Sequence, residues 1–175
     1  MPDDPNAIFN ATKIIGEQLC IAAKKTAIRV VRLSNVVGFA PNGTSLIPGL
    51  VKDAITRGRL SLTISPLSSK DYIAVDDVCD LLPRIALEGQ QSCYNVASGF
   101  NIELAEIVGL VDREFPTACE WRAGAPTVIF PIVDIDRIRT EFAFQPRPVR
   151  EALRFTLAQY RRHLAVPAGA NLTQA

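Results

Sequence analysis

The stretch "AIRVVRLSNVV" (27–37) decides the fold class, because it is apolar and β-branched with few polar breaks. A run of this kind is typical of a strand that is buried on both faces, as in a parallel sheet. The turn residues of "GFAPNGTS" (38–45) follow it and predict a loop. Parallel strands are joined by long crossovers, usually helices, so helical patterns are expected on both sides of this stretch.

Helical and strand patterns alternate along the rest of the chain. Apolar side chains recur at helical spacing over residues 7–24, and a second helical pattern covers 46–58 and ends at Gly58. Further strands are predicted at 60–65, 71–75, 92–98 and 119–124, and further helices at 76–88, 102–115, 134–142 and 150–164. This alternation predicts an α/β fold.

Composition and charge exclude several classes of protein. The chain has 175 residues, of which 48% are hydrophobic and 21% charged, as in a globular domain with its own core. A net charge of +1 does not suggest a nucleic-acid-binding protein. No apolar run is long enough to span a bilayer, and the start of the chain is acidic. We therefore expect a cytoplasmic protein without a signal peptide or membrane anchor.

The chain contains four cysteines and a single histidine. The cysteines are Cys20, Cys79, Cys93 and Cys119. They form no Cys-x-x-Cys pair, so no metal site is predicted. Because each has apolar neighbours in the sequence, we expect four reduced and buried thiols.

Six segments carry a resemblance to a known family. They are "FNATKIIGEQL" (9–19), "VRLSNVVG" (31–38), "KDYIAVDDV" (70–78), "CYNVASG" (93–99), "RAGAP" (122–126) and "DIDRIRTEFAFQPR" (134–147). In this order they resemble the C-terminal half of the extended short-chain dehydrogenase/reductase family, the NAD-dependent sugar-nucleotide epimerases and dehydratases. The resemblance runs from about residue 7 to about residue 160.

The resemblance implies the C-terminal part of a Rossmann-like NAD(P)-binding fold with a small substrate-binding subdomain. The family's N-terminal half carries a Gly-x-x-Gly-x-x-Gly turn for the cofactor pyrophosphate, and none of the ten glycines here forms that spacing. We therefore expect the Gly-rich half to be absent. We assign residues 1–45 to a Rossmann-like remnant, 46–164 mostly to the substrate-binding subdomain with an interleaved Rossmann strand, and 165–175 to a flexible tail.

The resemblance also assigns an active-site helix. In the family, a Tyr-x-x-x-Lys pair supplies a tyrosine general acid/base and a lysine that lowers its pKa and holds the nicotinamide ribose. Lys13 occupies the lysine position, and Phe9 occupies the tyrosine position without an oxygen to move a proton. The alternative is that Phe9 is a core aromatic and Lys13 a surface lysine.

Three more residues match substrate contacts of the family. Asn35 lies at the end of the 27–37 strand and matches a family residue that contacts the sugar nucleotide. Leu46 begins a segment that matches the nucleobase side of the family's pocket, and Arg122 matches the family arginine that holds the diphosphate. Each also has a structural alternative: a turn cap for Asn35, an apolar helix start for Leu46 and a solvated cation for Arg122. Lys70 stands where the family often has arginine, and Asp71 is expected to fix a turn.

The resemblance implies an NAD-dependent epimerase/dehydratase-like protein that binds a nucleotide sugar and is inactive by itself. NAD(P) is its implied cofactor, but we expect no NAD binding by this chain alone. One alternative is a subunit of a split enzyme whose Rossmann half is a separate chain. Another is a regulatory module that binds sugar nucleotides without catalysis. In each case we expect a partner, either a second copy that buries the 7–24 helix or the separate half, because the strand at 27–37 would otherwise be an edge.

Overall fold

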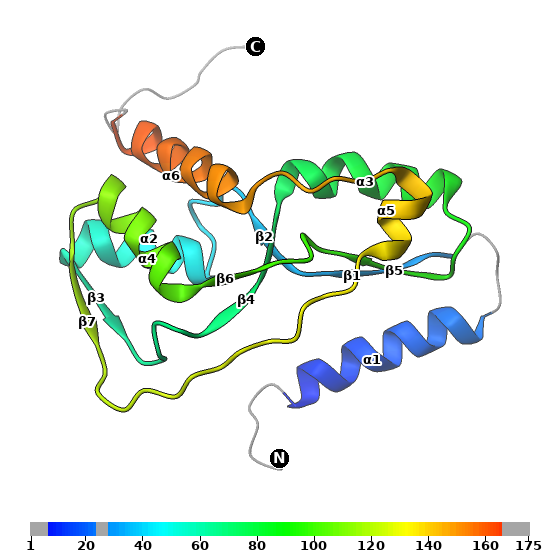
Figure 1. The fold of residues 1–175 in the computed structure, drawn as a ribbon, viewed down its shortest axis with the longest axis horizontal. Helices are drawn as coiled ribbons and strands as arrows, with labels where there is room; N and C mark the ends of the chain where they lie inside the picture. Colours follow the sequence, from blue (N-terminus) through cyan, green and yellow to red (C-terminus); the bar gives the residue numbers. More distant parts are fainter. Residues whose placement is uncertain (1–6, 24–27, 166–175) are drawn as a thin grey trace.

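The computed structural model describes residues 7–23 and 28–165 (Figure 1). Its helices are α1 (Ala7–Ala22), α2 (Leu46–Arg57), α3 (Val75–Glu88), α4 (Leu104–Glu114), α5 (Asp136–Phe142) and α6 (Val149–Ala165). Its strands are β1 (Val30–Leu33), β2 (Asn35–Val37), β3 (Arg59–Leu62), β4 (Ser69–Ala74), β5 (Cys93–Val96), β6 (Asn101–Glu103) and β7 (Ala118–Trp121). This order confirms the α/β class.

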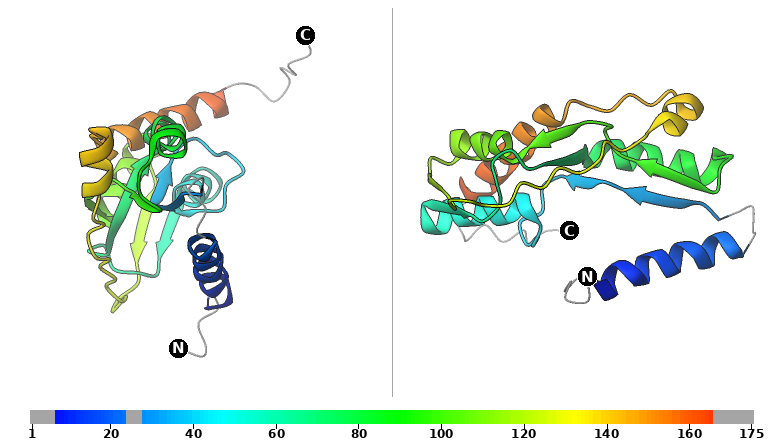
Figure 2. Two further views of the ribbon diagram at one scale, coloured as in Figure 1. Left: turned by 90° about the vertical axis from the view of Figure 1, so that its right-hand side faces the viewer. Right: turned by 60° about the horizontal axis from the view of Figure 1, so that its bottom comes forward.

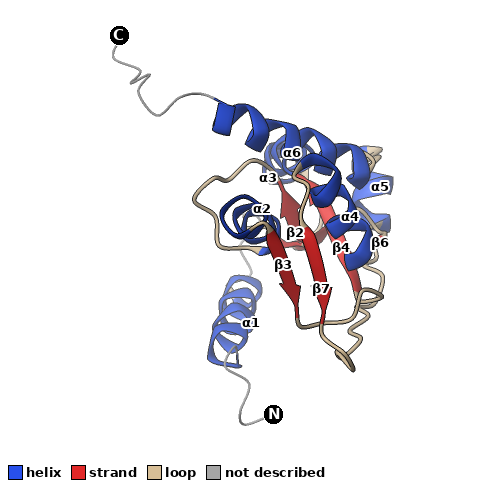
Figure 3. Cartoon of the chain, turned by 90° about the vertical axis from the view of Figure 1, so that its left-hand side faces the viewer, coloured by secondary structure: helices blue, strands red, loops and turns tan. Residues whose placement is uncertain are grey.

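The strands form short sheets that are mostly parallel. β1 pairs with β5, β2 with β4 and β3 with β7, all in parallel, whereas β6 runs antiparallel to β4. α1 and α3 lie on opposite sides of the β1–β5 pair (Figures 1 and 2). Seen from the other end, α2, α4 and α6 lie together beside the β3–β7 pair (Figure 3), where α2 packs against β3 and α4, and α4 packs against α6.

Two clusters of buried side chains form the core. The first joins α2, β3, α4 and α6, with Tyr72 of β4 among its members. The second joins α3, β5 and α5 around Tyr94 and Ile138. The predicted domain boundary at residue 45 stays a prediction, and the predicted tail at 166–175 lies outside the described residues.

Local signals explain some of the element boundaries. α2 ends at Gly58, which adopts φ +62° and donates its N–H to the Ala54 carbonyl, as a left-handed helix cap does. Residues 59–62 alternate between exposed and buried, as a half-buried strand requires. The three-residue strand β6 was not predicted, because its sequence continues into the helical pattern that begins at Leu104.

The expectation that 27–37 is buried on both faces is wrong for its described residues. Leu33 is 49% and Val36 40% exposed. Within the described part of the chain, β1 pairs with β5 alone, so its other edge is uncovered. α1 contains no buried residue, and Phe9 is 60% exposed rather than part of a core. The described chain therefore leaves one side of β1 and the surface of α1 open.

The expectation of buried thiols is also wrong. Cys20, Cys79 and Cys119 are exposed, and Cys93 is half-buried, although all four are free as predicted. Apolar neighbours in the sequence misled the prediction, since the helical phase turns Cys79 away from the core, and α1, which carries Cys20, contains no buried residue. None of the helices that the structure describes is long and apolar enough to cross a membrane.

Candidate functional site

A cavity of about 200 Å³ opens between β4, β6, α4 and the segment 128–130. Its polar lining comes from β4 and the turn before it, and the rest is apolar. The lining residues are Leu46, Ile64, Ser68, Ser69, Lys70, Tyr72, Ile102, Leu104, Ile107, Val128 and Phe130. We call it the Lys70 cavity, because Lys70 is the only charged residue in this set.

Lys70 is a cation without an acidic partner in this cavity. Its ammonium lies 5.4 Å from the centroid of the Tyr72 ring, a cation–π contact. Among the described residues, the ion pairs are made by other side chains, and none involves Lys70. Loss of hydration lowers the pKa of Lys70, and burial raises the pKa of Tyr72. The cavity therefore presents an uncompensated positive charge among apolar walls.

The strand period places these groups together. Lys70 and Tyr72 are two residues apart on β4, so their side chains leave the same face. The intervening Asp71 points elsewhere, because its carboxylate accepts hydrogen bonds from the turn at 98–100. This confirms the expectation that Asp71 fixes a turn.

Of the three predicted substrate contacts, only Leu46 lines the cavity. Asn35 lies beside it, opposite Tyr72 in the β2–β4 register, and its Nδ2 donates to the Asp71 carbonyl over 2.8 Å. Arg122 follows the end of β7, where its backbone N–H donates to the Leu62 carbonyl over 2.9 Å and its side chain is exposed. Ile64, two residues after the end of β3, lines the cavity. Since β3 and β7 are parallel, their carboxyl ends lie side by side, and Arg122 therefore lies at the end of this strand pair that faces the cavity.

The predicted catalytic pair lies elsewhere, on α1. The Lys13 ammonium is 5.0 Å from the centroid of the Phe9 ring, and both residues are exposed. No residue of α1 lines the Lys70 cavity or any of three other hollows of the described chain. The structure thus confirms that the two side chains meet on one helix face, but it does not join them to Leu46.

The described residues do not by themselves fit a dinucleotide. The described glycines with positive φ are Gly58, Gly99 and Gly124. None of these three belongs to a Gly-x-x-Gly-x-x-Gly turn that connects a strand to a following long helix. Lys13 is the predicted contact for NAD(P), and the residues that the structure describes place no phosphate-binding turn beside it. The described part of the chain also brings together no group of three potential metal ligands.

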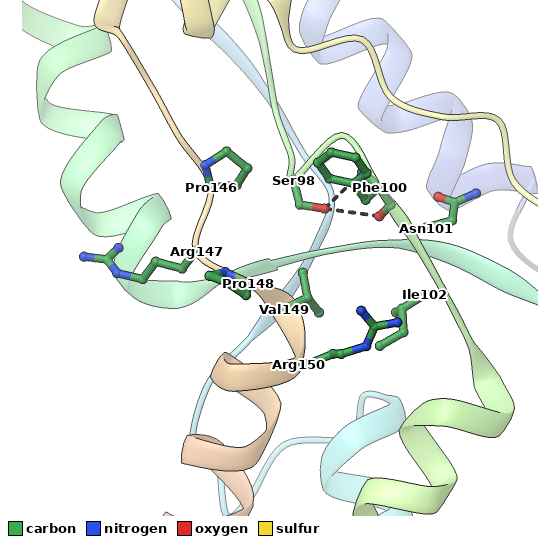
Figure 4. Close-up of a pocket in the computed structure, with 9 residues that line it drawn as sticks. All are labelled: Ser98, Phe100, Asn101, Ile102, Pro146, Arg147, Pro148, Val149 and Arg150. Atoms are coloured by element: carbon green, nitrogen blue, oxygen red, sulfur yellow. Dashed lines mark hydrogen bonds between the residues drawn. The ribbon is translucent and has the colours of Figure 1, made fainter.

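A second cavity, of about 290 Å³, lies between the 98–102 turn and the start of α6 (Figure 4). Its cations are already paired: Arg147 contacts Asp77 and Asp80, and Arg150 contacts Glu106. The Arg147 side chain points away from the 98–100 turn in Figure 4. Neutralised arginines give this cavity little attraction for an anion, so the Lys70 cavity is the better candidate site.

Sequence reasoning did not include Lys70 and Tyr72 among the candidate site residues. Their alternation in "KDY" was a usable signal, because it placed both side chains on one face of a predicted strand. The apolar walls gave no comparable signal, since they come from segments around 46, 102–107 and 128–130 that are far apart in sequence.

Comparison with known proteins places this fold. The family model of the NAD dependent epimerase/dehydratase family matches residues 1–97. No curated protein matches the chain significantly. Among solved structures, dTDP-glucose 4,6-dehydratase from Bacillus anthracis in complex with NAD is 20% identical, with a TM-score of 0.76. The match covers 93% of this chain and 55% of that one.

Two other solved structures agree. TunA, an NAD dependent NDP-hexosamine 5,6-dehydratase of tunicamycin biosynthesis, is 20% identical, with a TM-score of 0.78 over 91% of this chain and 55% of its own. MoeE5 in complex with UDP-glucose and NAD is 18% identical, with a TM-score of 0.74 over 93% and 59%. The chain thus spans about half the length of these structures. It belongs to the NAD-dependent epimerase/dehydratase family.

Proposed function

We propose that this chain is the substrate-binding part of a sugar-nucleotide epimerase or dehydratase, and that the Lys70 cavity takes part of a nucleotide sugar. The observation that carries the proposal is Lys70 itself, a half-buried ammonium without a carboxylate partner in a mostly apolar cavity. MoeE5, which has the same fold, binds UDP-glucose together with NAD.

The chemistry of the cavity suits a nucleoside diphosphate sugar. A partly desolvated ammonium gains more from a phosphate than from water, because the local dielectric is low. Aliphatic and aromatic walls suit the flat face of a base or a sugar ring. Arg122, at the neighbouring end of β7, supplies a second cation that can donate two hydrogen bonds to a phosphate.

We also propose that the chain does not catalyse proton transfer alone. Phe9 stands at the family's tyrosine position, and its ring offers no proton to donate or accept. Lys13 is the residue that would hold a nicotinamide ribose, and without a phosphate-binding turn it does not suffice for affinity. The expected behaviour is nucleotide-sugar binding without measurable NAD binding or turnover.

A split enzyme is the second candidate, and α1 and β1 favour it. A helix followed by a strand with a free parallel edge corresponds to the last two elements of a βαβ unit. Glu17 of α1 pairs with Arg32 of β1, so residues such as Ile15 and Leu19, on the opposite side of the helix, point away from the sheet. A separate Rossmann half or a second copy of this chain would cover both surfaces.

Calorimetric titration tests the binding proposal. We expect one of the UDP-, GDP- or dTDP-sugars to bind saturably and NAD to give no heat. Lys70→Met should weaken that binding about tenfold, the loss of one charge-assisted hydrogen bond. Lys52→Met is the matched control, since Lys52 is exposed on α2, and should change nothing. Equal binding by Lys70→Met, or no response to any nucleotide sugar, would contradict the proposal.

A further inference from the structure

We propose that Asp71 is the positioning residue of the Lys70 cavity, although its carboxylate does not line it. Asp71 lies between Lys70 and Tyr72 on β4 and holds both through the backbone. The expected effect of Asp71 on nucleotide binding rests on the proposed function, whereas its effect on the position of the Lys70 side chain does not.

The Asp71 carboxylate organises the turn that joins β5 to β6. It is 3% exposed and accepts four hydrogen bonds. They come from the Ser98 N–H (3.0 Å), the Ser98 hydroxyl (3.0 Å), the Gly99 N–H (2.7 Å) and the Phe100 N–H (3.0 Å). Three successive backbone N–H groups can converge on one carboxylate because Gly99 adopts φ +79°.

The backbone of Asp71 is fixed from the other direction. Its carbonyl accepts the Asn35 side-chain amide over 2.8 Å, and Asp71 lies opposite Asn101 in the β4–β6 ladder. Asp71 therefore ties β4 to β2, to β6 and to the 98–100 turn. No other residue of β4 has contacts of this kind on both its side chain and its carbonyl among the described interactions.

Lys70 depends on this anchor because it has few contacts of its own. Its ammonium has the Tyr72 ring as its described neighbour and no carboxylate to hold it. The position of a long side chain with so few contacts is determined mainly by the backbone of the strand that carries it. By fixing the pitch and register of β4, Asp71 sets where the cation meets an anionic group of the ligand.

Asp71→Asn is the decisive variant. It keeps the size of the side chain, but the amide NH2 is a donor and cannot accept a hydrogen bond. Because both carboxylate oxygens accept backbone N–H groups in the wild type, the NH2 faces a donor in either amide orientation. Asp76→Asn makes the same change at an exposed residue of α3 and serves as the matched control. Tyr94→Phe removes a half-buried hydrogen bond to Glu141 beside the other core cluster, and controls for loss of stability alone.

The readout is the NMR signal of Lys70 in protein with ¹³C-labelled lysine, assigned among the five lysines with Lys70→Met. In the wild type we expect an upfield ring-current shift from Tyr72 and a pKa below that of free lysine. Asp71→Asn should lose the shift, whereas Asp76→Asn and Tyr94→Phe should keep it. If Asp71→Asn does not fold, Ser98→Ala, which removes one of the four donors without a change of charge, should reduce the shift and raise the Lys70 pKa.

Binding of UDP-glucose separates this inference from the proposed function. If the wild type binds it, Asp71→Asn should weaken binding about tenfold and the two controls should not. If no nucleotide binds but the Lys70 signal moves, the proposed function fails and the positioning role stands. An unchanged Lys70 signal in folded Asp71→Asn or Ser98→Ala overturns the positioning role, whatever the binding result.

Discussion

The ammonium of Lys13 lies 5.0 Å from the centroid of the Phe9 ring on the exposed surface of α1. The spacing of four residues on a helix produces this contact, as it would for a tyrosine and lysine pair. Under the proposed assignment, Phe9 and Lys13 correspond to the family's acid/base pair without the hydroxyl group. This helix face would then retain the cation and lack the proton carrier.

Phe9→Tyr tests this geometry without any ligand. The introduced phenol should ionise below the usual tyrosine pKa of about 10, because the Lys13 ammonium favours the phenolate. Ultraviolet difference titration against the wild type reads it, because Tyr72, Tyr94 and Tyr160 are common to both proteins and cancel. Adding Lys13→Met should return the pKa to normal, and an identical titration with and without Lys13 would contradict the account. Phe9→Tyr alone should not produce turnover.

The contact of Arg147 with two carboxylates predicts unequal stability effects. Asp77 is 3% exposed and accepts both the Arg147 backbone N–H, over 2.9 Å, and its guanidinium. Asp77→Asn should lower the free energy of unfolding by about 2 kcal/mol, since a buried acceptor is lost. Asp80, 68% exposed, is the matched position, and Asp80→Asn should cost less than about 1 kcal/mol. Urea unfolding measures both, and equal costs would contradict the difference in burial.

Lys70 predicts a pH dependence of stability. Its pKa is lowered in the folded chain by loss of hydration, so the unfolded chain binds more protons between the folded pKa and about 10.4. Stability should therefore rise with pH through this window relative to Lys70→Met, which lacks the titrating group. Urea unfolding at several pH values measures the difference in the free energy of unfolding between the wild type and Lys70→Met. The other titrating groups are common to both proteins and cancel in this difference. A difference that stays constant would show that Lys70 is fully hydrated.

The open surface of α1 predicts self-association. Leu19 is 67% exposed on the side of the helix away from β1. If a second copy covers this side, Leu19→Glu should convert a dimer or larger assembly to monomer with little change in the monomer's melting temperature. Leu87→Glu on α3, where Leu87 is 85% exposed, should leave the assembly intact. Light scattering that finds a monomeric wild type at micromolar concentration would contradict self-association through α1.

The features predictable from sequence were those with a local cause. The end of α2 at Gly58 and the alternation of β3 follow from glycine conformation and strand period. The exposure of β1 had no local signal, because a strand's apolar composition does not reveal whether its neighbouring strand is present. The phase of α3 decided the exposure of Cys79, which its apolar neighbours concealed.

The candidate site was predictable only in part, for the same reason. Leu46 lines the cavity, and its role as a substrate contact stays a prediction, whereas the Asn35 side-chain amide donates to the Asp71 carbonyl. The importance of Lys70 depends on the absence of a carboxylate around it in the described chain, which is a property of the assembled structure. No pattern within one segment contains that information.

Mapping the bound nucleotide by NMR tests the central claim most directly. Titration of ¹⁵N-labelled protein with the nucleotide sugar that binds best should shift the amide signals of residues 68–72, Leu46 and Phe130, which surround the Lys70 cavity. The same titration with Lys70→Met should need about tenfold more ligand. Shifts confined to Arg147 and Arg150 at the other cavity, or no shifts with any nucleotide sugar, would contradict the claim.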